Sequence, residues 1–384
     1  MRILYLTADP GVPPLGGKGS SVHVRELVDA LVASGASVVV ATARTDVRDE
    51  RLSGARLVGI PVVLPKSQPT LASLRSAIRA QSTEIERIAH QCEVEGVYER
   101  FSLFSEGGVG AARRLGVPHV LEVNAPLRWE ARRFRSLAYA EDAASIERRV
   151  LGATDHVFAV SEELAALLAA DGVDETKIDV VPNGVDPTKV PARLRRGARG
   201  PFVVGFAGSL KPWHGVEVLV AACRRALVRV PDLRLEIVGE GPAAPQLDGL
   251  AREPRVTVHG QKSHARVLAL MSQWDAGLAP YLPLTNFYFS PLKVLEYMAA
   301  GACPIASDLG QIRSLLGAGS RGVLVEPGNS DALAAAIVNL ARDRGRAATL
   351  GKRAARYVRL SHTWSRNAER VLEALRSRQA HAAA

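Results

Sequence analysis

The chain has 384 residues, 47% of them hydrophobic and 23% charged, which excludes a disordered chain and predicts two globular domains, because one core rarely organises so many residues. Its formal net charge of +10 favours anionic partners, such as phosphate-bearing substrates or acidic lipid surfaces, unless the arginines only supply solvated surface. No zinc-finger, RNP or basic-helix signature supports nucleic acid as a partner.

Short apolar runs alternate with helical patterns along the first half of the chain, which is typical of a parallel sheet with helices on both faces. The first predicted strand is Arg2 to Thr7. The helix after it has apolar residues at i, i+3, i+4 and i+7 up to Leu31 and ends before Gly35. Further strands are expected at 37–41, 96–98, 119–123, 156–160 and 178–181.

The pattern stops after Asp186, because the Arg- and Gly-rich segment 192–201 lacks periodicity and marks a domain boundary. Strands are expected again at 202–207, 233–238, 255–259, 276–279, 304–306 and 322–325. The chain is therefore predicted to be an α/β protein with two doubly wound, Rossmann-like domains at 1–187 and 200–360. The final helix, in 361–384, carries an apolar stripe that it must bury, ahead of a frayed tail.

Three cysteines lie far apart in apolar segments, which argues against a disulfide framework and a zinc site and fits a reducing compartment. No apolar run has the length of a signal peptide core or a membrane span. We expect a soluble, cytoplasmic protein, with peripheral contact to a membrane as an open alternative.

The segment from Phe287 to Gly301 combines a turn containing Ser and Pro with an apolar helix that carries Glu296. Backbone N–H groups at a helix N-terminus attract phosphate, and a carboxylate one turn further in accepts hydrogen bonds from ribose hydroxyls. Three other segments support a nucleotide site: GGKGSSVHV from Gly16, PNGVD from Pro182 and GSLKPWHG from Gly208. Together the four segments resemble the retaining GT-B glycosyltransferases of family 4, over nearly the whole chain.

The resemblance implies a GT-B fold, in which two such domains face each other across a cleft and the final helix crosses back to the N-terminal domain. It implies transfer of a hexose, with retention, from a nucleotide diphosphate sugar on the C-terminal domain, with a UDP-sugar favoured and no cofactor. The acceptor is expected on the N-terminal domain. It stays open between a saccharide, a lipid-linked molecule and a small molecule.

The charge on the departing diphosphate must be stabilised by a metal ion or by fixed positive groups and dipoles. The chain has no Asp-x-Asp pair, so we expect no metal site and metal-independent transfer. Lys211 and Lys293 are the candidate cations, unless both are solvated. Because Lys293 lies one helical turn before Glu296, a purely structural salt bridge between them is an alternative.

The chain departs from the family pattern at several positions. The family has an arginine near Ser209 and a lysine near His214, so Lys211 is expected to take over the phosphate contact with His214 assisting. Of the family's paired glutamates, Glu296 matches the second, which holds the ribose. The first, which helps to place the donor sugar, is replaced by Tyr288. The consequence of this replacement for the donor sugar stays open.

The resemblance extends the donor site to glycine-rich turns and to the start of the helix before Glu296. The further donor-binding residues are Gly17, Gly19, Gly239, Glu240, Gly260, Gln261, Ser290 and Leu292. Ser20 or Ser21 is expected to cap the helix after the first of these turns.

At the end of the strand 119–123, Asn124 stands where many family members have a histidine that contacts the donor sugar. An amide can position a sugar hydroxyl but cannot shuttle a proton at neutral pH. Glu122 either joins it as a catalytic residue or is buried in an ion pair with an arginine.

The candidate acceptor-binding residues are His23, Tyr98, Arg100 and Arg128, although His23 has packing as its alternative. The segment 128–149 is expected to form a basic helix that grips a phosphorylated acceptor or rests on an anionic membrane, with a plain solvated helix as the alternative.

Two other functions stay open. A sugar-nucleotide 2-epimerase of this fold needs an acidic residue for proton abstraction, for which Glu122 is the only obvious candidate. A degenerate GT-B domain without catalysis, kept as a scaffold or partner subunit, is favoured by the departures at Ser209, His214, Asn124 and Tyr288.

Overall fold

The computed structural model describes residues 1–43, 51–52, 54–63, 70–134, 136–192, 200–284 and 286–382. The chain divides into two compact units. Unit 1 comprises Met1–Pro182, Tyr288–Ser290 and Trp364–Ala384, and unit 2 comprises Asn183–Phe287 and Pro291–Thr363. Most of the predicted Arg- and Gly-rich linker, 193–199, lies outside the described residues. Within those ranges, the structure contains no helix with the length and apolar character of a membrane span.

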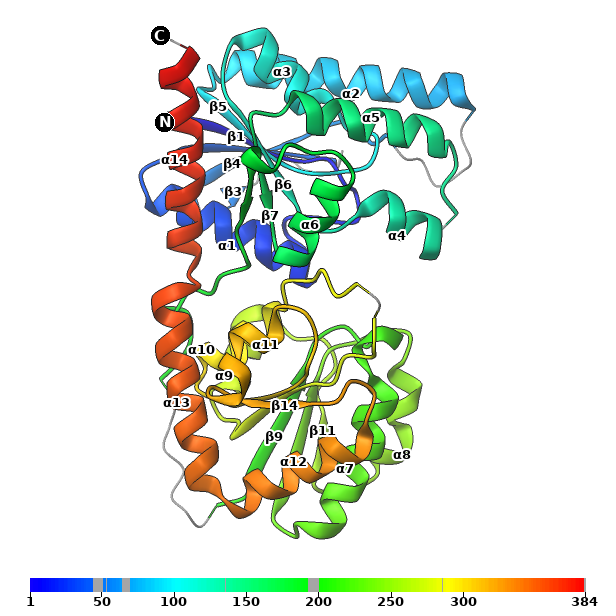
Figure 1. Ribbon diagram of the computed structural model, residues 1–384, viewed down its shortest axis with the longest axis vertical. Helices are drawn as coiled ribbons and strands as arrows, with labels where there is room; N and C mark the ends of the chain where they lie inside the picture. The colour runs from blue at the N-terminus through cyan, green and yellow to red at the C-terminus, as the bar shows by residue number, and fades with distance from the viewer. Residues whose placement is uncertain are drawn as a thin grey trace. The chain divides into compact units, whose positions relative to one another are not determined.

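Unit 1 contains an eight-stranded sheet in the order β3-β4-β2-β1-β5-β6-β7-β8 (Figure 1). Its strands are β1 (Arg2–Thr7), β2 (Ser37–Thr42), β3 (Arg51–Leu52), β4 (Ala55–Gly59), β5 (Gly96–Arg100), β6 (His119–Val123), β7 (His156–Ala159) and β8 (Ile178–Val180). All neighbours pair in parallel except β3 and β4. The strand order reverses direction between β1 and β5, so a crevice is expected at their carboxyl ends.

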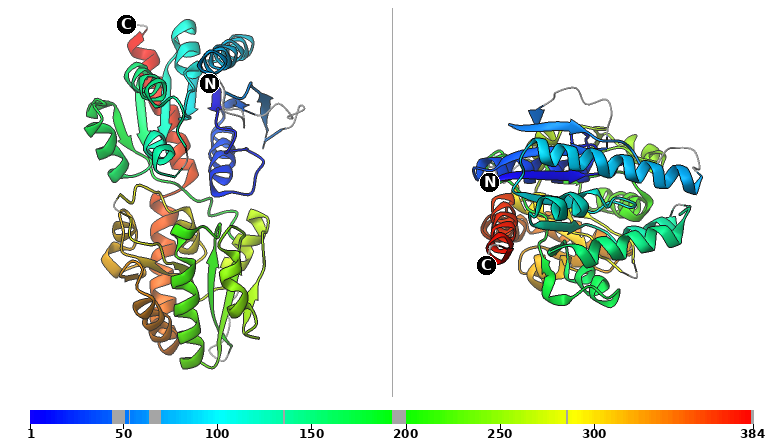
Figure 2. Two further views of the ribbon diagram at one scale, coloured as in Figure 1. Left: turned by 90° about the vertical axis from the view of Figure 1, so that its right-hand side faces the viewer. Right: turned by 90° about the horizontal axis from the view of Figure 1, so that it is seen from above.

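Helices cover both faces of this sheet (Figures 1 and 2). On one face, α2 (Leu71–Gln91), α3 (Gly107–Leu115) and α5 (Ala140–Ala153) bury apolar side chains against alternate strand residues such as Leu4 and Leu121. On the other, α1 (Gly19–Ala33) packs beside α14 (Trp364–Ala382), whose predicted apolar stripe is buried. Each fully buried Leu or Val side chain contributes about 1.5–3 kcal/mol. The remaining helices of unit 1 are α4 (Leu127–Phe134) and α6 (Glu162–Ala170).

Two features of unit 1 differ from the sequence prediction. The antiparallel pair β3 and β4 is not predicted, because β3 has only 2 residues and β4 only 5. The single basic helix predicted over 128–149 is wrong, since the segment forms the two helices α4 and α5. Tyr139, just before α5, has a φ of 56°, a left-handed conformation that a continuous helix does not contain.

Unit 2 contains a six-stranded, fully parallel sheet in the order β11-β10-β9-β12-β13-β14. Its strands are β9 (Phe202–Ala207), β10 (Leu233–Val238), β11 (Val256–Val258), β12 (Ala276–Ala279), β13 (Cys303–Ser307) and β14 (Val323–Val325). Its helices are α7 (Val216–Arg229), α8 (Asp248–Ala251), α9 (His264–Met271), α10 (Leu292–Ala299), α11 (Ile312–Leu315), α12 (Ser330–Arg342) and α13 (Arg344–Ser361). The prediction of two doubly wound α/β domains is confirmed. In unit 2 the order reverses between β9 and β12.

Two glycines let aromatic rings lie flat on the centre of this sheet. Gly205 of β9 and Gly277 of β12 are paired in register, and a Cβ at either would overlap the ring of Trp274 or of Tyr297. The hydroxyl of Tyr297 accepts from Ala207 N at 2.9 Å and donates to Leu278 O at 3.1 Å. This residue of α10 therefore ties together the carboxyl ends of β9 and β12, where the site loops begin.

Candidate active site

The loops that begin at the reversal point of unit 2 carry the predicted phosphate-binding residues. In open parallel sheets, ligands bind outside the carboxyl ends of the strands where the order reverses. The loop after β9 runs from Gly208 to Gly215, and the segment after β12 leads into α10. Lys211, His214, Lys293 and Glu296 therefore belong to the same edge of one sheet.

Lys293, in the first turn of α10, is a half-buried lysine whose ammonium lies among aromatic rings. Its Nζ lies 4.4 Å from the ring centroid of Phe206 and 5.3 Å from that of Tyr281. Burial lowers the pKa of Lys293 to about 7, although the nearby Glu296 carboxylate opposes this. Lys293 forms no ion pair with a described residue, and an anionic ligand would stabilise its charged form.

His214 is neutral at pH 7 and cannot supply positive charge. Its Nδ1 donates to Ser209 O at 2.5 Å, and its ring meets Tyr281 edge-on at 5.6 Å. Burial and the nearby Lys293 lower the pKa of His214 to about 3. It therefore shapes the loop that carries Lys211, whose Nζ lies 5.1 Å from the ring centroid of Trp213.

Glu296 is nearly buried, with 8% of its surface exposed, and accepts a hydrogen bond from His264 Nε2 at 2.7 Å. The predicted alternative, a salt bridge between Glu296 and Lys293, does not form in the described structure, where the carboxylate pairs with His264. His264 is not among the residues predicted from the sequence. Its only local signal is the N-cap residue Ser263, which places it at the start of α9.

A pocket of about 370 Å³ lies in unit 2. Its lining residues are Leu210, Gly239, Glu240, Ala244, Pro245, Leu247, Asp248, Ala251, Val258 and Gly260. Three predicted donor-binding residues, Gly239, Glu240 and Gly260, meet there. Gln261 is next to it and donates its backbone N–H to Glu240 Oε1 at 3.2 Å. Of the other candidates, Ser209 is exposed and Leu292 is half-buried, and neither lines this pocket.

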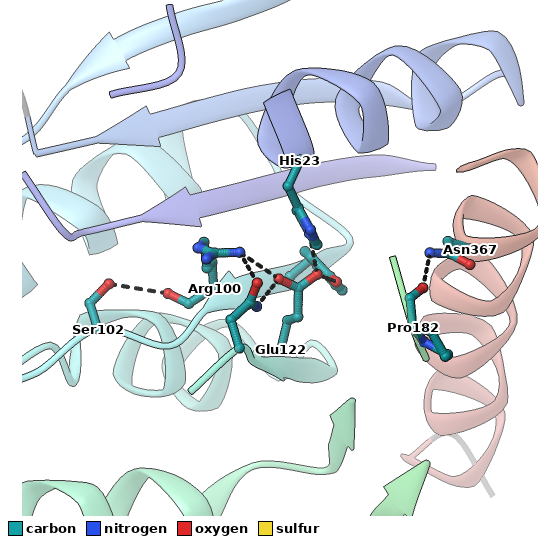
Figure 3. Close-up of polar contacts among 8 residues, drawn as sticks. His23, Arg100, Ser102, Glu122, Pro182 and Asn367 are labelled. Carbon is teal, nitrogen blue, oxygen red and sulfur yellow. Dashed lines mark hydrogen bonds and ion pairs between the residues drawn. The ribbon is translucent and has the colours of Figure 1, made fainter. Parts of the chain in front are cut away.

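Unit 1 contains a buried polar network around Glu122, at the reversal point of its own sheet (Figure 3). Glu122 accepts from His23 Nε2 at 2.8 Å, from Arg100 at 3.0 Å, and from the hydroxyl of Tyr98. The amide of Asn124 donates to Glu122 and accepts from Arg100. The structure thus brings together these five predicted catalytic and acceptor-binding residues.

Glu122 is a weak proton acceptor in this network. Burial alone would raise its pKa, but the charges of His23 and Arg100 and the hydrogen bonds from His23 and Tyr98 lower it to about 2. This is the buried ion pair that sequence analysis left as the alternative for Glu122. It argues against a 2-epimerase, which needs a carboxylate that takes up a proton near neutral pH.

The remaining candidates of unit 1 lie at its surface or in local contacts. Gly17 and Gly19 are exposed, and the predicted serine cap is wrong because the N-cap residue of α1 is Lys18, with no side-chain cap. Arg128 pairs with Glu147 at 3.4 Å and with Asp171 at 3.5 Å. Ser290 belongs to unit 1 by its contacts. In the described ranges, no three His, Cys, Asp or Glu side chains are grouped to hold a metal ion.

Comparisons with known proteins agree with this architecture. The family described as Glycosyltransferase Family 4 matches residues 17–189, and the family described as Glycosyl transferases group 1 matches residues 201–343. A curated relative, the alpha-maltose-1-phosphate synthase of Mycolicibacterium smegmatis, is 28% identical over 98% of this chain and 99% of its own.

Two solved structures share the fold. The sucrose-phosphate synthase of Thermosynechococcus elongatus has a TM-score of 0.76 at 21% identity and covers 100% of both chains. The Anabaena protein HepE, solved in complex with UDP and glucose, has a TM-score of 0.71 at 18% identity and covers 98% of this chain and 100% of its own. The chain therefore belongs to glycosyltransferase family 4, the group 1 glycosyl transferases, and has the GT-B fold.

Proposed function

We propose that the protein transfers a hexose, with retention of anomeric configuration and without a metal ion, from a UDP-sugar to an acceptor hydroxyl. The observation that carries this proposal is the half-buried Lys293, which has aromatic neighbours and no ion-pair partner among the described residues. Such a cation favours an anionic ligand, and a leaving diphosphate is the ligand that family membership suggests. HepE, a protein of the same fold, was solved with UDP, which supports uridine as the base.

The proposed donor contacts lie in unit 2. Lys293 and the N-terminus of α10 receive the diphosphate, with Lys211 on the neighbouring loop as a second cation. Glu296 accepts a ribose hydroxyl while His264 holds its carboxylate in place. The pocket at Gly239 and Gly260 receives the rest of the nucleotide.

In the reaction, the bond between the acceptor oxygen and the anomeric carbon forms as the bond from that carbon to the diphosphate breaks. The acceptor proton passes to the departing phosphate oxygen on the same face of the sugar. The protein needs no nucleophile for this step, so the low pKa of Glu122 is compatible with it. Lys293 stabilises the negative charge that develops on the departing phosphate in the transition state, and this stabilisation lowers the barrier.

The proposal is tested by thermal shift with UDP, GDP, ADP and dTDP, each with Mg²⁺ or with EDTA. We expect UDP to raise the unfolding midpoint most, equally in both conditions, because a ligand of the folded state stabilises it in proportion to its affinity. Lys293→Met should abolish the shift, and Lys352→Met, at an exposed position of α13, should not.

The anomeric configuration of the product is then read by NMR after incubation with UDP-glucose and a panel of saccharides. An inverted product, or a strict Mg²⁺ requirement, would contradict the proposed mechanism. Tight UDP binding with no release of UDP from any UDP-sugar would instead favour the non-catalytic scaffold.

A further inference from the structure

Helix α4 of unit 1 presents an aromatic ring and a carboxylate side by side. Trp129 is 40% exposed, and it is the only aromatic side chain among the exposed large hydrophobic residues of the described ranges. Glu130 follows it and is half-buried. Arg133, one turn further, lies over the Trp129 ring with its guanidinium carbon 5.5 Å from the ring centroid.

Tyr288 contacts both Trp129 and Glu130. Its side chain is 2% exposed, its hydroxyl donates to Glu130 Oε1 at 2.5 Å, and its ring meets that of Trp129 edge-on at 6.2 Å. Its carbonyl oxygen accepts from Ser161 Oγ at 2.9 Å, which fixes the backbone. Burial and the contact with Glu130 raise the pKa of Tyr288 well above its usual value, so the phenol stays a hydrogen-bond donor.

The second oxygen of Glu130 is available to a ligand. Tyr288 occupies Oε1, and within the described part of the chain Oε2 has no hydrogen-bond or ion-pair partner. The carboxylate cannot swing away without breaking the contact with Tyr288. A fixed acceptor therefore stands next to an exposed indole ring.

We propose that Trp129 and Glu130 form a sugar-binding site, occupied by one pyranose ring of a saccharide acceptor. The C–H face of a pyranose packs on an aromatic ring, and its hydroxyls donate to a carboxylate oxygen, which matches the two groups on α4. Tyr288 is the positioning residue of this site. The inference deepens the proposed function by naming the acceptor class, and it rests on that function only for the transfer step.

A lipid surface fits the same residues less well. Membrane docking by an interfacial helix requires several large apolar side chains on one face, whereas Trp129 is the only exposed one that the structure describes on α4. The Glu130 carboxylate also opposes contact with anionic headgroups.

Saturation-transfer-difference NMR of the full chain, without donor, tests the site with maltotriose, cellotriose and mannotriose. We expect at least one trisaccharide to bind, with an affinity loss of about tenfold or more in Trp129→Ala. Glu130→Gln and Tyr288→Phe should each lose roughly 3- to 10-fold, since each weakens one hydrogen bond to a charged group. Glu141→Gln, at an exposed position in the first turn of α5, is the matched control and should bind as wild type.

The outcomes separate this inference from the proposed function. Thermal unfolding first shows that each variant is folded, and a UDP thermal shift that equals that of the wild type shows that unit 2 is intact. Binding of no trisaccharide, or equal binding by wild type and Trp129→Ala, overturns the site. Phosphatidylglycerol vesicles bound through Trp129, with no trisaccharide signal, overturn it in favour of a lipid surface. Trisaccharide binding in a protein that UDP does not stabilise would keep the site and reject the proposed function.

Discussion

The ammonium of Lys293 lies 4.4 Å from the ring centroid of Phe206, so an aromatic face stabilises the charge of this half-buried lysine. An aromatic ring stabilises a positive charge without neutralising it. The full charge therefore remains for an anionic ligand, and the cost of burial makes that ligand's contribution larger.

UDP affinity should fall as the pH rises above about 7. The pKa of Lys293 is lowered to about 7, and a bound diphosphate raises it again, so binding takes up a proton where the free lysine is neutral. The expected loss is up to about tenfold per pH unit. Calorimetry between pH 6.5 and 8.5 in buffers of different ionisation enthalpy measures the proton uptake. Lys293→Arg should remove the dependence, and a flat wild-type profile would count against the assignment.

The same lysine should make the ligand-free protein more stable as the pH rises from about 7 towards the usual lysine value of about 10.4. In this window the unfolded chain binds a proton that the folded state has lost, so the free energy of unfolding increases with pH. Denaturant unfolding of Lys293→Met should show a smaller slope than the wild type over this range. Equal slopes would mean that Lys293 titrates normally in the folded state.

Gly208→Ala should impair UDP binding without touching the ligand directly. A Cβ at Gly208 would lie 2.7 Å from Lys293 Nζ, and the φ of +145° is unfavourable for any other residue. We expect the lysine to be displaced and UDP affinity to fall by about tenfold or more, the loss of one charge-assisted contact. Gly152→Ala, where a Cβ meets no atom within 4 Å, is the control. Wild-type affinity in Gly208→Ala, measured by calorimetry, would show that the position of Lys293 does not matter.

Glu296→Gln should weaken UDP binding by about tenfold or more, because a hydrogen bond to a charged group contributes about 1.5–3 kcal/mol. His264→Ala should have a smaller effect, and the double variant should lose less than the sum, since both residues act through one carboxylate. The same variants should bind 2′,3′-dideoxy-UDP as the wild type does. Equal losses for both ligands would place Glu296 away from the ribose.

Glu122→Gln should destabilise unit 1 by about 3–5 kcal/mol, because it leaves a buried arginine without its counter-charge. The pKa of Glu122 is lowered from 4.5 to about 2, so its stabilisation is complete above pH 4.5 and is lost as the pH falls towards 2. Urea unfolding at pH 7 and pH 3 should show this acid loss in the wild type and a smaller one in the variant. Glu141→Gln is the exposed control, and an equally stable Glu122→Gln would remove the structural role of the network.

Several strands could be predicted to the residue because apolar residues recur in them, either in a run or at alternate positions. The predicted bounds of β1, β6, β9, β10 and β12 match the structure. Strand β9 is buried along its whole length, whereas β10 alternates, with Arg234 exposed. The edge strand β3 and its neighbour β4 were not predictable, because a short strand with one partly exposed face needs its neighbours to be recognised.

Local sequence by itself determined the two doubly wound domains, the family resemblance, and the candidacy of Lys293 and Glu296, because these depend on periodicity and on motifs of adjacent residues. Only the tertiary structure decided which side chains meet: His264 with Glu296, Arg100 with Glu122, and Tyr288 with Glu130, which are 158 positions apart. Charge state was decided there too, because the pKa of a lysine or a carboxyl depends on burial and on partners that folding brings from distant parts of the chain.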